Sequence, residues 1–264
     1  MRFSLVLVLE VALSEGADVQ PSCGRVSGSV GGQDIPTGRW PWFAGFYFQS
    51  LLFCSGSLIT DQWLLSGLKI FLLFFLSVFL CLFESGQFNF RKHVMENGLD
   101  NNICLVKLSS PVELSDHISP VCLAAENSTF PNGTFSWITG NNLGDAHEEI
   151  MELQPHIWGD NECQHSQFTI TDNKICTRND PPMKQPCFVF FGAPLLIIND
   201  DLVWIQFGVS LSSLMCRKER YPPVSTRVSR YQDWIRSVTG SSQLGFVTFS
   251  SSGDDGVSAS TSSP

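Results

Sequence analysis

Cysteine is the residue type with the most evident chemistry in this sequence, because nine cysteines are scattered over 264 residues. They stand at positions 23, 54, 81, 104, 122, 163, 176, 187 and 216. None belongs to a paired C-x-x-C motif of the kind that binds zinc. Scattered cysteines favour disulfide bonds and an oxidising compartment, and an odd number leaves at least one thiol unpaired within the chain.

Two further sets of side chains carry groups that can act as bases or metal ligands. They are the histidines His93, His117, His147, His156 and His165, and the acidic residues Asp145, Glu148, Glu149 and Glu152. We interpret the histidines as surface or capping residues and the acidic run as a solvated loop. The sequence therefore predicts no metal site and no cofactor.

Three features predict passage through the secretory pathway. The first 13 residues place one basic residue before a short apolar run, as in a signal peptide, although Glu10 interrupts the run. Cleavage near Gly16 or Ala17 gives a signal over residues 1–17. Asn127-Ser128-Thr129 and Asn132-Gly133-Thr134 are N-glycosylation sequons in one polar, loop-like stretch. We therefore predict a secreted, extracellular glycoprotein with sugars at Asn127 and Asn132.

Composition places the chain among globular proteins. The apolar fraction is 43% and the charged fraction 16%, with a net charge of −9. No basic stripe is present, so nucleic acid is not an expected partner. All-β chains of about 200–250 residues often form one compact unit.

Short apolar runs separated by turn residues extend from about Val30 to Ile235. Many short strands at this spacing predict an all-β barrel or sandwich. Residues 228–238 alternate at helical spacing and predict a terminal helix. Beyond Thr239 the composition turns to Ser, Gly, Asp and Thr, so we expect a flexible tail or linker over 240–264.

The segment Ile70–Phe83 fits this pattern badly, because Ser77 is its only polar residue among 14. A membrane helix needs roughly 20 apolar residues, so a span is disfavoured. A buried strand pair or helix and a sequence error such as intron read-through both stay open.

An ordered set of motifs resembles the trypsin-like (S1) serine proteases, especially the secreted tryptase- and prostasin-like members. The motifs are Val30-Gly31-Gly32, Trp40-Pro41-Trp42, Cys54–Ile59, Trp63–Ser66, Ile103–Leu108, Pro120–Leu123, Cys187 with Gly192, Pro194 and Leu195, Pro222–Val228, and Tyr231–Ile235. The resemblance covers Cys23 to Ile235 with a break near 67–95. It implies two six-stranded antiparallel β-barrels over 30–239, with the catalytic cleft between them, after a degenerate pro-segment over 18–29.

The family mechanism needs a nucleophilic hydroxyl, an imidazole base and a carboxylate that holds the imidazole. The resemblance places Lys69 at the histidine position, Asn102 at the aspartate position and Phe191 at the serine position. An ammonium with a pKa of about 10.4 is not a base at neutral pH. A phenyl ring offers no nucleophile, so no acyl-enzyme forms. We therefore predict that the chain does not cleave peptide bonds.

The residues at other positions that the family uses for oxyanion binding, specificity and activation are also replaced. Val189 replaces a glycine that donates to the oxyanion, and loss of one such donor costs roughly 3–4 kcal/mol. Gln185 stands where tryptic members carry aspartate in the specificity pocket. Gly28 and Phe190 replace the basic activation residue and the aspartate beside the serine. We expect the phenylalanines near Phe191 to plug the former cleft.

The resemblance also implies a disulfide pattern. Its expected bonds are Cys23–Cys122, Cys163–Cys176 and Cys187–Cys216. Cys54, Cys81 and Cys104 are left over. A Cys54–Cys81 bond stays open, and Cys104 is expected to be a buried thiol.

Three functional hypotheses follow. The first is a secreted pseudoprotease that binds an unidentified protein partner. The second is an active serine endopeptidase whose sequence is faulty around 67–95. The third is a decayed gene or an inactive module of a multi-domain protease.

Overall fold

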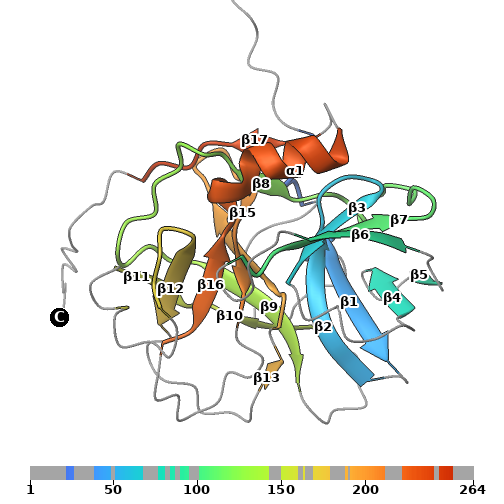
Figure 1. Cartoon of the computed structure of the whole chain (residues 1–264), viewed down its shortest axis with the longest axis horizontal. Coiled ribbons are helices and arrows are strands. Elements are labelled where there is room, and N and C mark those ends of the chain that lie inside the picture. The colour runs from blue at the N-terminus through green and yellow to red at the C-terminus, as the bar shows by residue number, and fades with distance from the viewer. Residues whose placement is uncertain are drawn as a thin grey trace, which may run out of the picture.

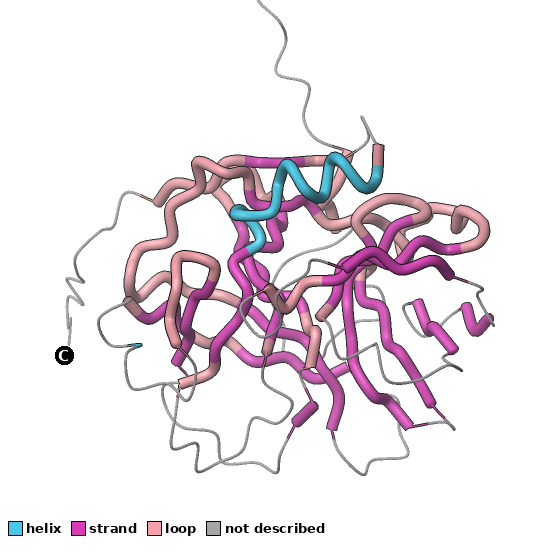
Figure 2. Tube along the Cα trace, in the orientation of Figure 1, coloured by secondary structure: helices cyan, strands magenta, loops and turns pink. Residues whose placement is uncertain are grey.

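The computed structural model is built almost entirely from β-strands, with one short helix near the end of the chain (Figures 1 and 2). It describes residues 22–26, 39–48, 51–67, 77–80, 84–86, 90–94, 101–142, 150–159, 163, 169–178, 188–189, 191–211, 222–240 and 244–251.

The first sheet has seven strands in the order β5-β4-β1-β2-β3-β7-β6, and every neighbouring pair is antiparallel. Its strands are β1 (Phe43–Phe48), β2 (Leu51–Leu58), β3 (Trp63–Ser66), β4 (Ser77–Leu80), β5 (Glu84–Gly86), β6 (Phe90–Val94) and β7 (Cys104–Leu108). All four side chains of β3 are buried, namely three apolar residues and the polar Ser66.

The second sheet has ten strands, and its main path runs β10-β9-β14-β15-β16-β12-β11. These strands are β9 (Trp137–Asn142), β10 (Ile150–Leu153), β11 (His156–Trp158), β12 (Lys174–Arg178), β14 (Pro194–Ile198), β15 (Trp204–Ser210) and β16 (Val224–Arg227). Off this path, β13 (Phe188–Val189) pairs with β9, and β8 (Cys122–Ala124) lies parallel to both β15 and β17 (Phe246–Val247).

The predicted all-β trypsin-like fold with a C-terminal helix is confirmed. The prediction of two six-stranded antiparallel barrels differs in its details, because the two sheets hold seven and ten strands and β8 pairs in parallel with β15 and β17. The short strands β4 and β5 lie at one edge of the first sheet, and β8, β13 and β17 lie off the main path of the second.

Four tryptophan rings make the centre of the packing between the sheets. The Trp204 ring lies 4.9 Å from that of Trp40 and 5.0 Å from that of Trp137, both edge-on. Trp42, just before β1, lies 6.1 Å from Trp204 of β15. Because these residues come from both sheets, the two halves of the molecule share one apolar core.

The end of the chain follows the expected helix and then departs from the expectation. A 3-10 turn (Val228–Tyr231) leads into α1 (Gln232–Thr239), which ends at Gly240 in the left-handed conformation, with φ 63°. A flexible tail was expected from residue 240 on. Residues 244–251 instead pack on the domain, because Phe246, Val247 and Phe249 give this stretch apolar side chains to bury. Residues 252–264 lie outside the described part.

The apolar segment Ile70–Phe83 contributes one described element, β4, which pairs with β1. A strand is therefore present in this segment, in line with one of the open alternatives.

Among the residues that the structure describes, no helix is long and apolar enough to cross a membrane.

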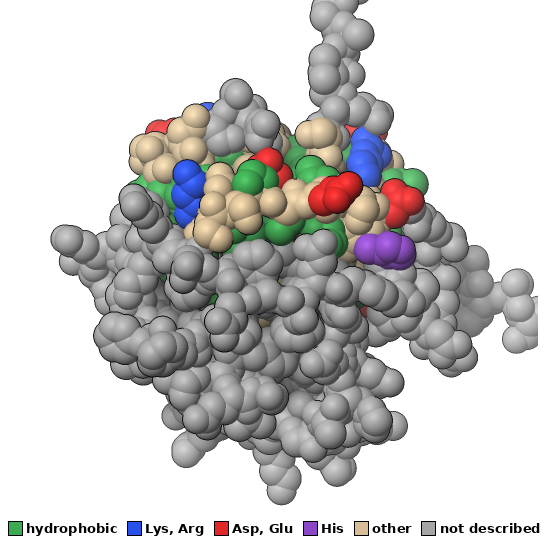
Figure 3. All heavy atoms as spheres, turned by 90° about the vertical axis from the view of Figure 1, so that its right-hand side faces the viewer, with side chains coloured by type: hydrophobic (Ala, Val, Ile, Leu, Met, Phe, Trp, Pro, Cys, Tyr) green, Lys and Arg blue, Asp and Glu red, His purple; other side chains and the backbone are tan. Residues whose placement is uncertain are grey.

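Charged side chains of both signs are interspersed over the described part of the face shown in Figure 3.

Candidate active site

Asn102 lies immediately before β7 and reaches across to the second sheet. Its side chain is buried, with 5% exposure, and its amide nitrogen Nδ2 lies 3.4 Å from the carbonyl oxygen of Ser210. Its own carbonyl accepts a hydrogen bond of 3.0 Å from the hydroxyl of Thr226. Strands β15 and β16 therefore fix this residue from both its side chain and its backbone.

Asn101, the residue before Asn102, is also fixed by hydrogen bonds. The side-chain oxygen Oδ1 of Asn101 accepts hydrogen bonds from the Tyr231 hydroxyl at 2.8 Å and from the Asn173 amide at 3.4 Å. The Ile103 amide also donates to the Asn101 carbonyl, which makes a tight turn into β7. This network fixes where the Asn102 side chain enters the space between the sheets.

Phe191 lies in the turn before β14, and its ring belongs to the shared core. The residue is 5% exposed, and its carbonyl oxygen accepts a hydrogen bond of 2.9 Å from the Ser55 amide of β2. The apolar ring of Phe191 is packed in the core rather than solvated. Phe190 lies outside the described residues.

Gly192 lets the turn pass between the two sheets. Its φ is +72°, and a Cβ there would lie 2.5 Å from both the Ser55 carbonyl and the Ser66 hydroxyl. Its amide donates to the Ser210 carbonyl at 3.1 Å. Only glycine combines this backbone conformation with so close an approach.

Asn102 and the Phe191 turn meet at two residues that sequence reasoning missed. A Cβ on Gly67 would lie 2.9 Å from Asn102 Nδ2 and 3.3 Å from the Gly192 Cα. The Ser210 carbonyl accepts from both the Gly192 amide and the Asn102 side chain. The signal for Gly67 was a glycine directly after an apolar strand, which marks close backbone approach. Ser210 carried no comparable signal.

Several predicted positions lie outside the described residues, namely Lys69, Gln185, Cys187 and Cys216. Val189 is described only as part of β13, where it pairs with Asn141 of β9. Within the described ranges, no three His, Cys, Asp or Glu side chains come together as a metal site requires.

Two of the expected disulfides are present, Cys23–Cys122 and Cys163–Cys176. Cys54 and Cys104 are buried thiols, as expected for Cys104. Strand β3 separates β2 from β7, so their backbones lie roughly 10 Å apart, beyond the reach of a disulfide. Burial raises the pKa of the Cys54 thiol well above its usual value, and nearby Cys104 adds to the rise. A thiol with a raised pKa is a poor nucleophile.

Comparison with known protein families matches residues 29–71 and 82–235 to the family described as trypsin. The chain belongs to the trypsin family. It is 29% identical to human testisin over 268 residues, which covers 87% of this chain and 85% of testisin. It is also 29% identical to the bovine suppressor of tumorigenicity 14 protein homolog over 255 residues, covering 82% of this chain but only 28% of that protein.

The family match bears directly on the apolar segment. It stops at residue 71 and resumes at residue 82, so the unmatched stretch lies inside Ile70–Phe83. Asn102 and Phe191 both lie within the matched range 82–235.

Proposed function

We propose that this trypsin-family chain is a secreted, non-catalytic homologue that acts as a protein-binding or regulatory module. The observation that carries the proposal is Phe191, the residue that the family resemblance places at the nucleophile position. Its ring is 5% exposed and part of the core between the sheets. A buried phenyl group cannot attack a carbonyl carbon.

Asn102 supports the same proposal from the other side of the site. Its amide lies beside the Ser210 carbonyl, which is a hydrogen-bond acceptor and suits the Nδ2 donor. An amide in place of the carboxylate does not stabilise an imidazolium, and this replacement alone lowers turnover by about 10⁴-fold in serine proteases. Lys69 and Val189 extend the proposed losses to the base and the oxyanion positions.

Secretion and glycosylation belong to the proposal as well. The disulfides Cys23–Cys122 and Cys163–Cys176 are compatible with an oxidising compartment. Asn127 and Asn132 are exposed residues in turns, which suits glycan attachment. The signal over residues 1–17 lies outside the described part.

An active endopeptidase with a faulty sequence around 67–95 is the second candidate, and the break in the family match at 72–81 favours it. Such an error changes Lys69 but leaves Asn102 and Phe191 unexplained. A decayed gene, or an inactive module of a larger protease, is the third candidate. Sequencing the transcript across codons 60–100 tests the second, and failure to detect secreted protein supports decay.

The test of the main proposal is chemical. The purified secreted chain is incubated with a serine-directed fluorophosphonate and with a panel of generic peptide substrates, with active trypsin as the positive control. We expect neither labelling nor hydrolysis above the background of heat-denatured protein. Fluorophosphonate labelling that heat denaturation abolishes would refute the proposal.

A further inference from the structure

Residues 244–251, which we call the C-terminal strap, lie directly over one of the two described disulfides. The amide of Leu123 donates to the Gly245 carbonyl at 2.8 Å, and that carbonyl lies 3.8 Å from the sulfur of Cys23. A Cβ added to Gly245 would collide with the Cys23 sulfur and lie 3.5 Å from that of Cys122. The strap backbone at Gly245 therefore packs directly against the Cys23 sulfur.

Contacts on either side of Gly245 hold the strap in this position. Strand β17 of the strap pairs in parallel with β8, and the Ala125 amide donates to the Val247 carbonyl at 2.9 Å. Further along, the Thr129 amide donates to the Phe249 carbonyl at 2.8 Å. The Phe249 ring is 7% exposed and stacks on Phe130 at 5.8 Å. On the helix side, the Arg236 guanidinium lies over the Phe246 ring.

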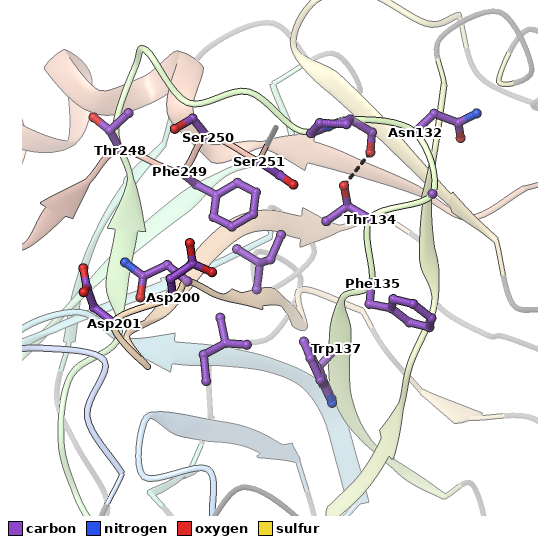
Figure 4. A pocket seen from close by; sticks show the side chains of 15 residues that line it. Asn132, Thr134, Phe135, Trp137, Asp200, Asp201, Thr248, Phe249, Ser250 and Ser251 are labelled. Atoms are coloured by element: carbon purple, nitrogen blue, oxygen red, sulfur yellow. Dashed lines mark hydrogen bonds between the residues drawn. The ribbon is translucent and has the colours of Figure 1, made fainter. Parts of the chain in front are cut away.

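The outer end of the strap is less closely packed. A cavity of about 710 Å³ lies beside this end and is lined on the strap side by Thr248, Ser250 and Ser251. Thr134 and Trp137 line its opposite side (Figure 4). Phe249 points into this space from the strap (Figure 4). Because the cavity borders the strap on this side, the strap is attached mainly through β8 and the disulfide. Its detachment withdraws Leu244 and Phe246 from the edge of the shared core and leaves the pairing of the main strands of both sheets intact.

We propose that the C-terminal strap is a cover that closes the Cys23–Cys122 disulfide to thiol reductants. The two cysteines are 3% and 0% exposed with the strap in place. Reduction requires a thiolate to reach one sulfur, form a mixed disulfide and release the second cysteine, after which a second thiol completes the exchange. Two reductant thiols become one disulfide as the protein bond becomes two thiols. The attacking thiolate needs open space beside the sulfur, and the strap fills that space.

The consequence concerns the N-terminal segment 22–26, which this disulfide joins to β8. The Gly24 amide also donates to the Pro120 carbonyl at 2.8 Å, and the Trp204 amide donates to the Gly24 carbonyl at 2.9 Å. The Arg25 side chain donates to the Asp201 carbonyl at 2.7 Å. A protected disulfide keeps this segment covalently anchored, and reduction of the disulfide after the strap detaches leaves the segment held by non-covalent contacts alone. This inference does not depend on the proposed function, since it uses no residue of the candidate active site.

The experiment measures native-state reduction of each disulfide. The secreted full-length chain, a chain ending at residue 243, and the variants Gly245→Ala and Phe249→Ala are exposed to dithiothreitol without denaturant. Newly formed thiols are then alkylated and quantified by peptide mass spectrometry. Ser250→Ala, at an exposed residue of the strap, is the matched control. The Cys163–Cys176 bond is the internal reference in every sample.

We expect the truncated chain and both strap variants to lose the Cys23–Cys122 bond at least about tenfold faster than the full-length chain, with the reference bond unchanged. Ser250→Ala should match the full-length chain. Equal Cys23–Cys122 rates in the full-length and truncated chains would overturn the proposal, and so would equal acceleration of both bonds. If truncation or Gly245→Ala prevents folding, Phe249→Ala decides the matter, because it removes only the side chain that stacks on Phe130 and leaves the strap backbone unchanged.

Discussion

Phe191→Ser puts a hydroxyl at the position that we propose for the lost nucleophile, and we predict that it destabilises the protein without creating activity. Phe191 is 5% exposed and packs in the core shared by both sheets. Truncation of a buried phenylalanine to alanine costs about 3–5 kcal/mol. Serine adds a hydroxyl to an apolar site, which costs about 1–3 kcal/mol more without a partner. We therefore expect a loss of about 4 kcal/mol or more.

Urea unfolding followed by tryptophan fluorescence measures this loss, because four tryptophans lie in or beside the same core. Phe191→Leu keeps an apolar side chain and should lose less than about 1.5 kcal/mol. Phe135→Ser is the matched control, since Phe135 is 61% exposed and should shift stability by no more than about 0.5 kcal/mol. If Phe191→Ser and Phe135→Ser unfold at the same urea concentration, Phe191 does not support the core and the reasoning fails.

Two further predictions concern the same region. Gly192→Ala should lower the free energy of unfolding by more than about 2 kcal/mol, because the added Cβ would lie 2.5 Å from atoms of Ser55 and Ser66. Gly133→Ala is the control, since Gly133 has φ +83° and open space around it. It should therefore show only the backbone cost of about 1–2 kcal/mol. Equal losses in thermal unfolding would contradict the packing argument. Burial raises the pKa of the Cys54 thiol, so the folded state keeps that proton better than the unfolded state does. Its contribution to stability is full below about pH 8.5 and declines as pH rises toward the raised pKa. Between pH 8 and pH 10, the urea concentration at the unfolding midpoint should therefore fall further in the parent chain than in Cys54→Ala. An identical fall in both chains would exclude this contribution.

The sequence predicted those features that follow from local pattern. The apolar run of β3, the helical spacing of α1 and the order of the family motifs all lead to the observed architecture. Long-range contacts were not predictable in this way. Ser210 joins Asn102 to the Phe191 turn through its backbone amide and carbonyl, and backbone groups leave no trace in the residue type. The strap was missed because a composition rich in Ser and Gly conceals the few apolar residues, such as Phe249, that attach it.

Under the proposed assignment of Phe191 to the nucleophile position, a return of catalysis has a cost in packing. The Phe191 ring is part of the core between the sheets, so a reversion to serine leaves a cavity as well as a hydroxyl. Under the same proposal, the Asn102 amide still stands in place of a carboxylate and Lys69 in place of the base. Recovery of activity then requires changes at all three positions together with new packing at the turn. Under the proposed function, selection for stability alone therefore opposes the first step of such a recovery.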